Sequence, residues 1–150
     1  MKAYIDTSVF GGYFDIEFEA ASKLFFEEIE KGIKKPVISD LTYSEIQKAP
    51  LQVRELYNKI EDKLTTIKVN KKIVELADAY VKAGALTQKS IEDAIHIASA
   101  TVKKVDVIVS WNFKHIVNLN RILIFNKVNI KMGYTEMEIR TPIEVLEINK

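Results

Sequence analysis

Three acidic residues occupy positions where a carboxylate could take part in chemistry. Asp6 directly follows the short apolar run Ala3-Tyr4-Ile5. Glu45 lies in a short polar segment that Pro50 brings to an end. Asp93 precedes an almost wholly apolar stretch, residues 94–98, so its side chain needs a partner if that stretch is buried. Carboxylates of this kind can hold hard divalent cations or move protons.

Each of the three acids also has a purely structural interpretation. Asp6, with Thr7 and Ser8 behind it, could cap a turn or a helix. Thr42 and Glu45 have the spacing of a capping box, and so do Ser90 and Asp93. Taken singly, none of the three positions decides between a helix cap and an active site.

The types of side chain present restrict what a site could bind. The chain has no cysteine, which excludes disulfides, thiolate nucleophiles and cysteine-based zinc or iron–sulfur sites. It has only two histidines, too few for a histidine-rich transition-metal site. A metal bound here would therefore have mostly oxygen ligands, which favours magnesium or manganese.

The remaining candidates are assigned mainly structural roles. We interpret His96 as a half-buried histidine on a packed helix in preference to a general base, and His115 as a surface residue. Trp111 and Phe113 are expected in the core or at its rim. Asp106 begins a strand and is excluded, because it would lie at the edge of the sheet opposite the proposed site.

Strand-like and helix-like segments alternate along the chain, which predicts an α/β domain with a mostly parallel sheet. Gly11-Gly12 is expected to break the chain. Expected strands cover residues 3–5, 36–39 and 106–110, with a strand or loop at 64–69 and an edge strand near Ile139; expected helices cover 17–31, 42–48, 53–60, 70–84, 90–102 and 121–132.

In parallel sheets, ligands bind beyond the carboxyl ends of the strands. This rule brings together two distant parts of the sequence. Asp6 ends the first expected strand, while Ser110 and Asn112 end or follow the strongest one. We therefore expect these residues at one edge of the sheet.

Charge and hydropathy give little indication of a partner. The 22 basic and 21 acidic residues leave a formal net charge of +1, which neither indicates nor excludes a nucleic-acid binder. The lysine pairs Lys34-Lys35, Lys71-Lys72 and Lys103-Lys104 are expected to be solvated helix ends. The N-terminus does not resemble a signal peptide, and no apolar run is long enough to span a membrane, so we expect a cytoplasmic protein.

Four stretches, taken in order, resemble the PIN domain, especially toxin nucleases of the VapC type. They are Tyr4-Ile5-Asp6-Thr7-Ser8, Ser44-Glu45-Ile46, Glu92-Asp93-Ala94-Ile95-His96-Ile97-Ala98 and Val109-Ser110-Trp111-Asn112-Phe113. No single stretch is specific; their order and spacing are. The resemblance spans essentially the whole chain and implies one PIN-like domain over residues 1–150, with three α/β/α layers.

The resemblance also implies a function and a set of site residues. Asp6, Glu45, Asp93 and Asn112 match the catalytic, metal-holding positions of the family, with Thr7, Ser8 and Ser110 as accessory residues. The implied activity is a Mg²⁺- or Mn²⁺-dependent endoribonuclease, the toxin of a toxin–antitoxin pair. The implied partners are an RNA substrate, a small antitoxin protein and a second copy of the chain.

Asn112 departs from the family pattern, since many members have aspartate there. An amide oxygen can ligate a hard cation but brings no charge, which puts a second tightly held metal in doubt. The main alternative is therefore a PIN-like domain that binds RNA or protein without cutting. A phosphotransferase with Asp6 as nucleophile ranks lower, because a haloacid-dehalogenase-like enzyme needs aspartate where Ser8 stands. A plain scaffold, whose acids are all helix caps, is the third alternative.

Overall fold

A five-stranded, wholly parallel sheet runs through the computed structural model, which describes residues 1–146. The strand order is β3-β2-β1-β4-β5. The strands are β1 (Lys2–Ile5), β2 (Lys35–Ser39), β3 (Thr65–Ile67), β4 (Val107–Val109) and β5 (Glu138–Arg140). β1 occupies the centre and pairs with β2 on one side and with β4 on the other.

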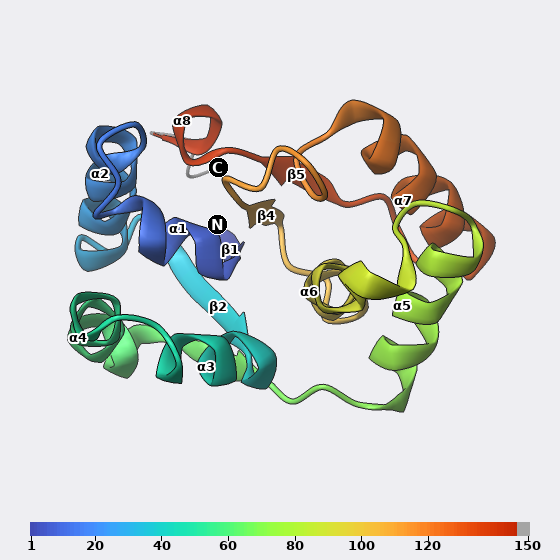
Figure 1. Cartoon of the computed structure of the whole chain (residues 1–150), viewed down its shortest axis with the longest axis horizontal. Coiled ribbons are helices and arrows are strands. Elements are labelled where there is room, and N and C mark those ends of the chain that lie inside the picture. Colours follow the sequence, from blue (N-terminus) through green and yellow to red (C-terminus); the bar gives the residue numbers. More distant parts are fainter. Residues whose placement is uncertain (147–150) are drawn as a thin grey trace.

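Helices cover both faces of the sheet. They are α1 (Thr7–Gly12), α2 (Glu19–Glu30), α3 (Asp40–Gln47), α4 (Leu51–Ile60), α5 (Lys71–Lys82), α6 (Ile91–Val102), α7 (Leu119–Lys131) and α8 (Pro142–Val145), with short 3₁₀ turns at Glu61–Lys63 and Gln88–Ser90. Figure 1 shows α1 to α4 and α8 on one side of the strands and α5 to α7 on the other. The expected three-layer α/β/α arrangement is confirmed.

Each face of the sheet has its own apolar core. Tyr4 and Ile108 point into the core formed with α5, α6 and α7. Ala3, Ile5 and Val109 point into the core formed with α1, α2 and α4. Alternate residues of β1 and β4 thus enter opposite cores, which explains why residues 3–5 and 107–109 of these central strands are all apolar.

Most predicted elements are present, and one unexpected helix, α1, precedes the expected break at Gly11-Gly12. The two glycines are the last residues of α1. Gly12 is packed so tightly that an added Cβ would lie 2.6 Å from the Trp111 ring and 2.8 Å from Ser22 Oγ. The glycine therefore permits a close contact between helix and side chain, which a local sequence pattern cannot reveal.

A second correction concerns the lysine pairs. Lys34 is buried, and its ammonium group lies 2.6 Å from Glu28 Oε1. It is therefore an interior ion pair and not a solvated helix end. Among the described residues, no helix is both long and apolar enough to cross a membrane.

Candidate active site

Asp6 is fixed at the carboxyl end of the central strand. Its backbone N–H donates to the Val109 carbonyl at 3.0 Å, which extends the pairing of β1 with β4. The residue is only 5% exposed. Its Oδ2 accepts hydrogen bonds from Ser8 Oγ at 2.7 Å and Ser110 Oγ at 2.9 Å. Asp6 stands at the N-terminus of α1, but its side chain makes no capping hydrogen bond there.

The two serines link Asp6 to the loop after β4. Ser8 Oγ accepts a hydrogen bond from the Trp111 backbone N–H at 3.0 Å, and Ser110 Oγ accepts one from the Asn112 N–H at 2.9 Å. Each hydroxyl thus donates to the carboxylate and accepts from the loop. These contacts bring together Asp6, Ser8 and Ser110, as the sequence predicted for this edge of the sheet.

Glu45 reaches the same place from α3. That helix begins at Asp40, and its capping box is formed by Ser39 and Thr42. The structural alternative for Glu45, a capping box with Thr42, is therefore excluded, because the helix starts two residues earlier than expected. Glu45 Oε1 instead accepts from Thr7 Oγ1 at 2.6 Å and contacts His96 Nε2 at 2.7 Å.

His96 lies between the acids. It is 1% exposed, with Nδ1 2.6 Å from the Tyr4 hydroxyl and Nε2 3.7 Å from Asp6 Oδ1. Burial alone lowers the pKa of His96, but the oxygens of Tyr4, Glu45 and Asp6 outweigh burial and raise the pKa well above its ordinary value. An imidazolium is therefore favoured at neutral pH, and it supplies a positive charge between two carboxylates.

The same histidine lowers the pKa of Glu45. Burial alone raises that pKa, but the hydrogen bond and charge of His96, together with the hydrogen bond from Thr7, reverse the direction. His96 is thus buried completely, not by half as expected. Its contacts with Tyr4 and Glu45 span 92 and 51 residues of sequence.

Asp93 lies in the first turn of α6, three residues before His96. The side chain of Ser90 makes no capping hydrogen bond, so the structural alternative for Asp93, a capping box with Ser90, is excluded as well. Asp93 Oδ2 lies 2.9 Å from His115 Nδ1. Burial raises the pKa of Asp93, and the negative charge of Asp6 raises it further, while His115 offsets part of the rise. Asp6 and Asp93 therefore repel each other across the site.

Asn112 lies in the loop that directly follows β4, where it stabilises a turn. Its Oδ1 accepts a hydrogen bond from the His115 backbone N–H at 2.9 Å, which closes the turn after β4. Among residues 1–146 we find no hydrogen bond from its side chain to Asp6, Glu45 or Asp93. His115, expected on the surface, is held by this turn against Asp93.

The aromatic residues flank the site without entering it. Trp111 donates from Nε1 to Ser22 Oγ, and its ring stacks on Phe18 with the centroids 4.3 Å apart. It therefore belongs to the core, as predicted. Phe113 is 49% exposed and forms the rim. Asp106 accepts from the Lys2 backbone N–H at the opposite edge, which agrees with its exclusion.

The donor types at this edge suit a hard cation, but the side chains are not yet gathered around one point. Asp6, Glu45 and Asp93 all offer carboxylate oxygens, and the repulsion between Asp6 and Asp93 is the kind that a cation relieves. In the part of the chain that the structure describes, however, no three His, Asp or Glu side chains already form a metal-binding group. Glu45 and Asp93 instead face His96 and His115.

Comparisons with known proteins identify the fold. No protein-family model matches the sequence, and no curated protein matches it. Among solved structures, the chain is similar to one from the crystal structure of VapBC2 from Rickettsia felis bound to a DNA fragment from their promoter. The two are 12% identical, the match covers 94% of this chain and 98% of that one, and the TM-score is 0.61. The expected PIN-like α/β fold is thereby confirmed.

Proposed function

We propose that this protein is a divalent-metal-dependent endoribonuclease, the VapC-like toxin of a toxin–antitoxin pair, formed by one PIN-like domain over residues 1–150. The observation that supports the proposal most directly is the position of the acids. Asp6, Glu45 and Asp93 come from three different elements and lie around His96 at the carboxyl edge of a parallel sheet. Sheets of this kind bind their ligands at that edge.

In the proposed reaction, Asp6, Glu45 and Asp93 would hold Mg²⁺ or Mn²⁺. The bound ion would lower the pKa of a water molecule and neutralise charge on the attacked phosphodiester. Ser8 and Ser110 fix the orientation of Asp6 through its Oδ2, and Oδ1, which lies 3.7 Å from His96 Nε2, would be the atom offered to the ion. Thr7 does the same for Glu45. Asn112 would contribute by holding the loop that carries His115, or as a ligand after a rotation of its side chain.

The comparison with solved structures supports one of the proposed partners. The solved neighbour is a VapBC2 complex on promoter DNA, so we propose that a small antitoxin binds this chain as well. We further propose RNA as the substrate, the cytoplasm as the place of action and a homodimer as the assembly. A search of the adjacent gene for a small DNA-binding protein tests the antitoxin directly.

Cleavage of a mixed RNA pool tests the activity. The purified chain is incubated with magnesium, with manganese or with a chelator. We expect cleavage with either metal and none with chelator, and a loss of about 100-fold or more in the Asp6→Asn, Asp93→Asn double variant. A matched control is the Glu19→Gln, Glu138→Gln variant, which removes two exposed carboxylates away from the site. Full activity in the Asp6→Asn, Asp93→Asn variant would refute the assignment.

A second candidate is a PIN-like domain that binds RNA or protein without cutting. The contacts of His96 with Glu45 and of His115 with Asp93 favour it, because each histidine already satisfies a carboxylate. In that case neither metal would raise the melting temperature, and RNA would remain intact at every metal concentration.

A further inference from the structure

A pocket lined by lysines lies beside β2 and β3, outside the acid cluster. Its volume is about 290 Å³. It is lined by Lys2, Lys35, Val37, Thr65, Thr66, Ile67, Lys68, Lys103 and Val105. We call it the lysine pocket. Its four lysines come from four regions of the sequence, and no acidic residue lines it.

The ammonium groups of this pocket are available to a ligand. Lys2, Lys35, Lys68 and Lys103 are all exposed. Within residues 1–146, none of them forms an ion pair. Four positive charges thus gather on a protein whose net charge is only +1. Such a concentration attracts anions strongly.

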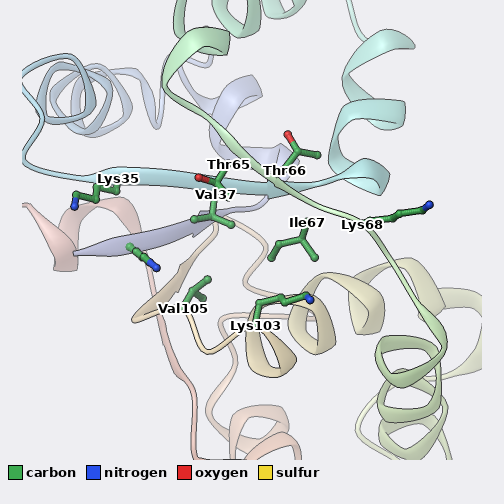
Figure 2. Close-up of a pocket in the computed structure, with 9 residues that line it drawn as sticks. Lys35, Val37, Thr65, Thr66, Ile67, Lys68, Lys103 and Val105 are labelled. Atoms are coloured by element: carbon green, nitrogen blue, oxygen red, sulfur yellow. The ribbon is translucent and has the colours of Figure 1, made fainter.

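The lysines are spread along the pocket and do not converge on one point. Lys35 begins β2 and Lys68 follows β3, and the pairing of Val37 with Thr65 places them five residues apart along the strand direction. Five residues of strand correspond to about 16 Å. Figure 2 shows Lys35 and Lys68 at opposite ends, with Lys103 between them on the far wall. A single phosphate cannot reach all of these groups, whereas a chain of phosphates can.

The remaining lining favours one nucleic-acid strand over a duplex. A volume of about 290 Å³ admits a sugar or a base but is far too narrow for a double helix. Val37, Ile67 and Val105 provide an apolar floor, and Thr65 lies at the wall with a hydroxyl that can contact a phosphate. Lysine ammonium groups along an apolar groove are typical of backbone binding without selection of sequence.

We propose that the lysine pocket binds the phosphodiester backbone of a single-stranded polynucleotide. This site is separate from the acid cluster, so it does not require that the protein cut RNA. Lys68 lies at the carboxyl end of β3, the sheet edge that also carries Asp6. A strand bound along the pocket would therefore extend from the amino ends of β1 and β2 toward that edge.

The test measures the binding of a fluorescein-labelled oligouridylate of about 12 nucleotides. Binding is detected as an increase in fluorescence anisotropy, and a chelator is present so that cleavage does not interfere. The Lys35→Gln, Lys68→Gln variant is compared with Lys127→Gln, Lys131→Gln, which removes two lysines from a groove beside α5 and α7. We expect at least about fivefold weaker binding for the first variant and less than about twofold for the second. The plot of the logarithm of the binding constant against the logarithm of the salt concentration has a negative slope. Its magnitude should decrease by about 1.4 in the first variant, because two phosphate contacts are lost.

Further arms distinguish the nature of the ligand. Oligodeoxyuridylate should bind within about threefold of the RNA, because the phosphates are shared. Lys35→Arg, Lys68→Arg should restore binding, which separates loss of charge from loss of fold. Equal weakening by both glutamine variants would reduce the effect to general attraction and overturn the proposal. The proposal would also be overturned if polyglutamate bound as tightly as RNA and its binding depended on Lys35 and Lys68, since the pocket would then bind an acidic protein.

Discussion

The acid cluster and the lysine pocket use charge in opposite ways. In the acid cluster, Asp6, Glu45 and Asp93 are partly or fully buried, and His96 and His115 compensate them within the fold. In the lysine pocket, four exposed ammonium groups have no ion-pair partner among residues 1–146. The net charge of +1 hides this separation, because it sums all 22 basic and 21 acidic residues of the chain. Charge that the fold compensates supports stability, and charge left exposed is available to a ligand.

The largest expected effect comes from removing the compensating charge. His96→Leu should lower the free energy of unfolding by about 3 kcal/mol or more, because Asp6 and Glu45 then remain buried without a cationic partner. Lys68→Gln, in the lysine pocket, should change it by less than about 0.5 kcal/mol. Urea denaturation measures both.

A double-variant cycle identifies the cause. If the pairing with His96 is responsible, His96→Leu combined with Glu45→Gln should cost less than the sum of the single variants. Strict additivity would mean that His96 acts only by filling space.

The packing beneath the acid cluster should give the next largest effect. Gly12→Ala should destabilise the protein by about 1–3 kcal/mol, because its Cβ would lie 2.6 Å from Trp111. Gly11→Ala is a matched control one residue away, where an added Cβ meets nothing within 4 Å. It should stabilise α1 by about 0.5–1 kcal/mol. If Gly12→Ala and Gly11→Ala lowered the melting temperature equally, the contact of Gly12 with Trp111 would not be the cause.

Adding an acid to the cluster should change metal affinity by a smaller amount. Asn112→Asp keeps an oxygen that can accept from the His115 N–H and adds a negative charge near Asp93. We expect the dissociation constant for Mg²⁺ or Mn²⁺ to fall by at least about threefold. Calorimetric titration compares it with the wild type and with Asn112→Ala. An unchanged or weaker affinity would place Asn112 outside the range of the ion.

Removing an acid should give the smallest effect, and it should depend on pH. The pKa of Asp93 is raised by burial and by Asp6, so the folded state disfavours its charged form. At pH 7 this lowers the stability of the wild type, and Asp93→Asn should relieve it by about 1 kcal/mol or less. The pKa of Asp93 is higher in the folded state than in the unfolded state. As the pH falls through these two values, Asp93 of the wild type becomes protonated, and the difference in stability between the wild type and Asp93→Asn should vanish. Urea titrations at several pH values, without metal, measure it; an advantage of Asp93→Asn that grows on acidification would contradict this origin.

Local patterns were sufficient to predict most of the fold. The apolar runs of β1, β2 and β4 and the cap at Asn70, whose Oδ1 accepts from the Ile73 N–H, act over a few residues. The rule for parallel sheets then placed Asp6 and Ser110 together, and Ser110 Oγ does donate to Asp6. Gly12 could not be predicted, because its environment depends on Trp111, 99 residues later.

The site was only partly predictable for the same reason. His96 and His115 were judged by their own segments, whereas their roles depend on partners in distant elements. The capping boxes, which were the structural alternatives for Glu45 and Asp93, are absent for a different reason. Spacing alone does not fix where a helix starts, and in α3 Ser39 forms the box with Thr42.

The central position of β1 determines when the acid cluster can form during synthesis. Asp6 emerges from the ribosome early, but its oxygen is held by Ser110, 104 residues later, and its strand pairs with Val107–Val109. A nascent chain that ends before β4 therefore has one side of β1 unpaired. Contacts of such long range also form slowly. Truncated translation products that end before Ser110 would lack the hydrogen bond that orients Asp6, so the acid cluster can form only after that residue has been made.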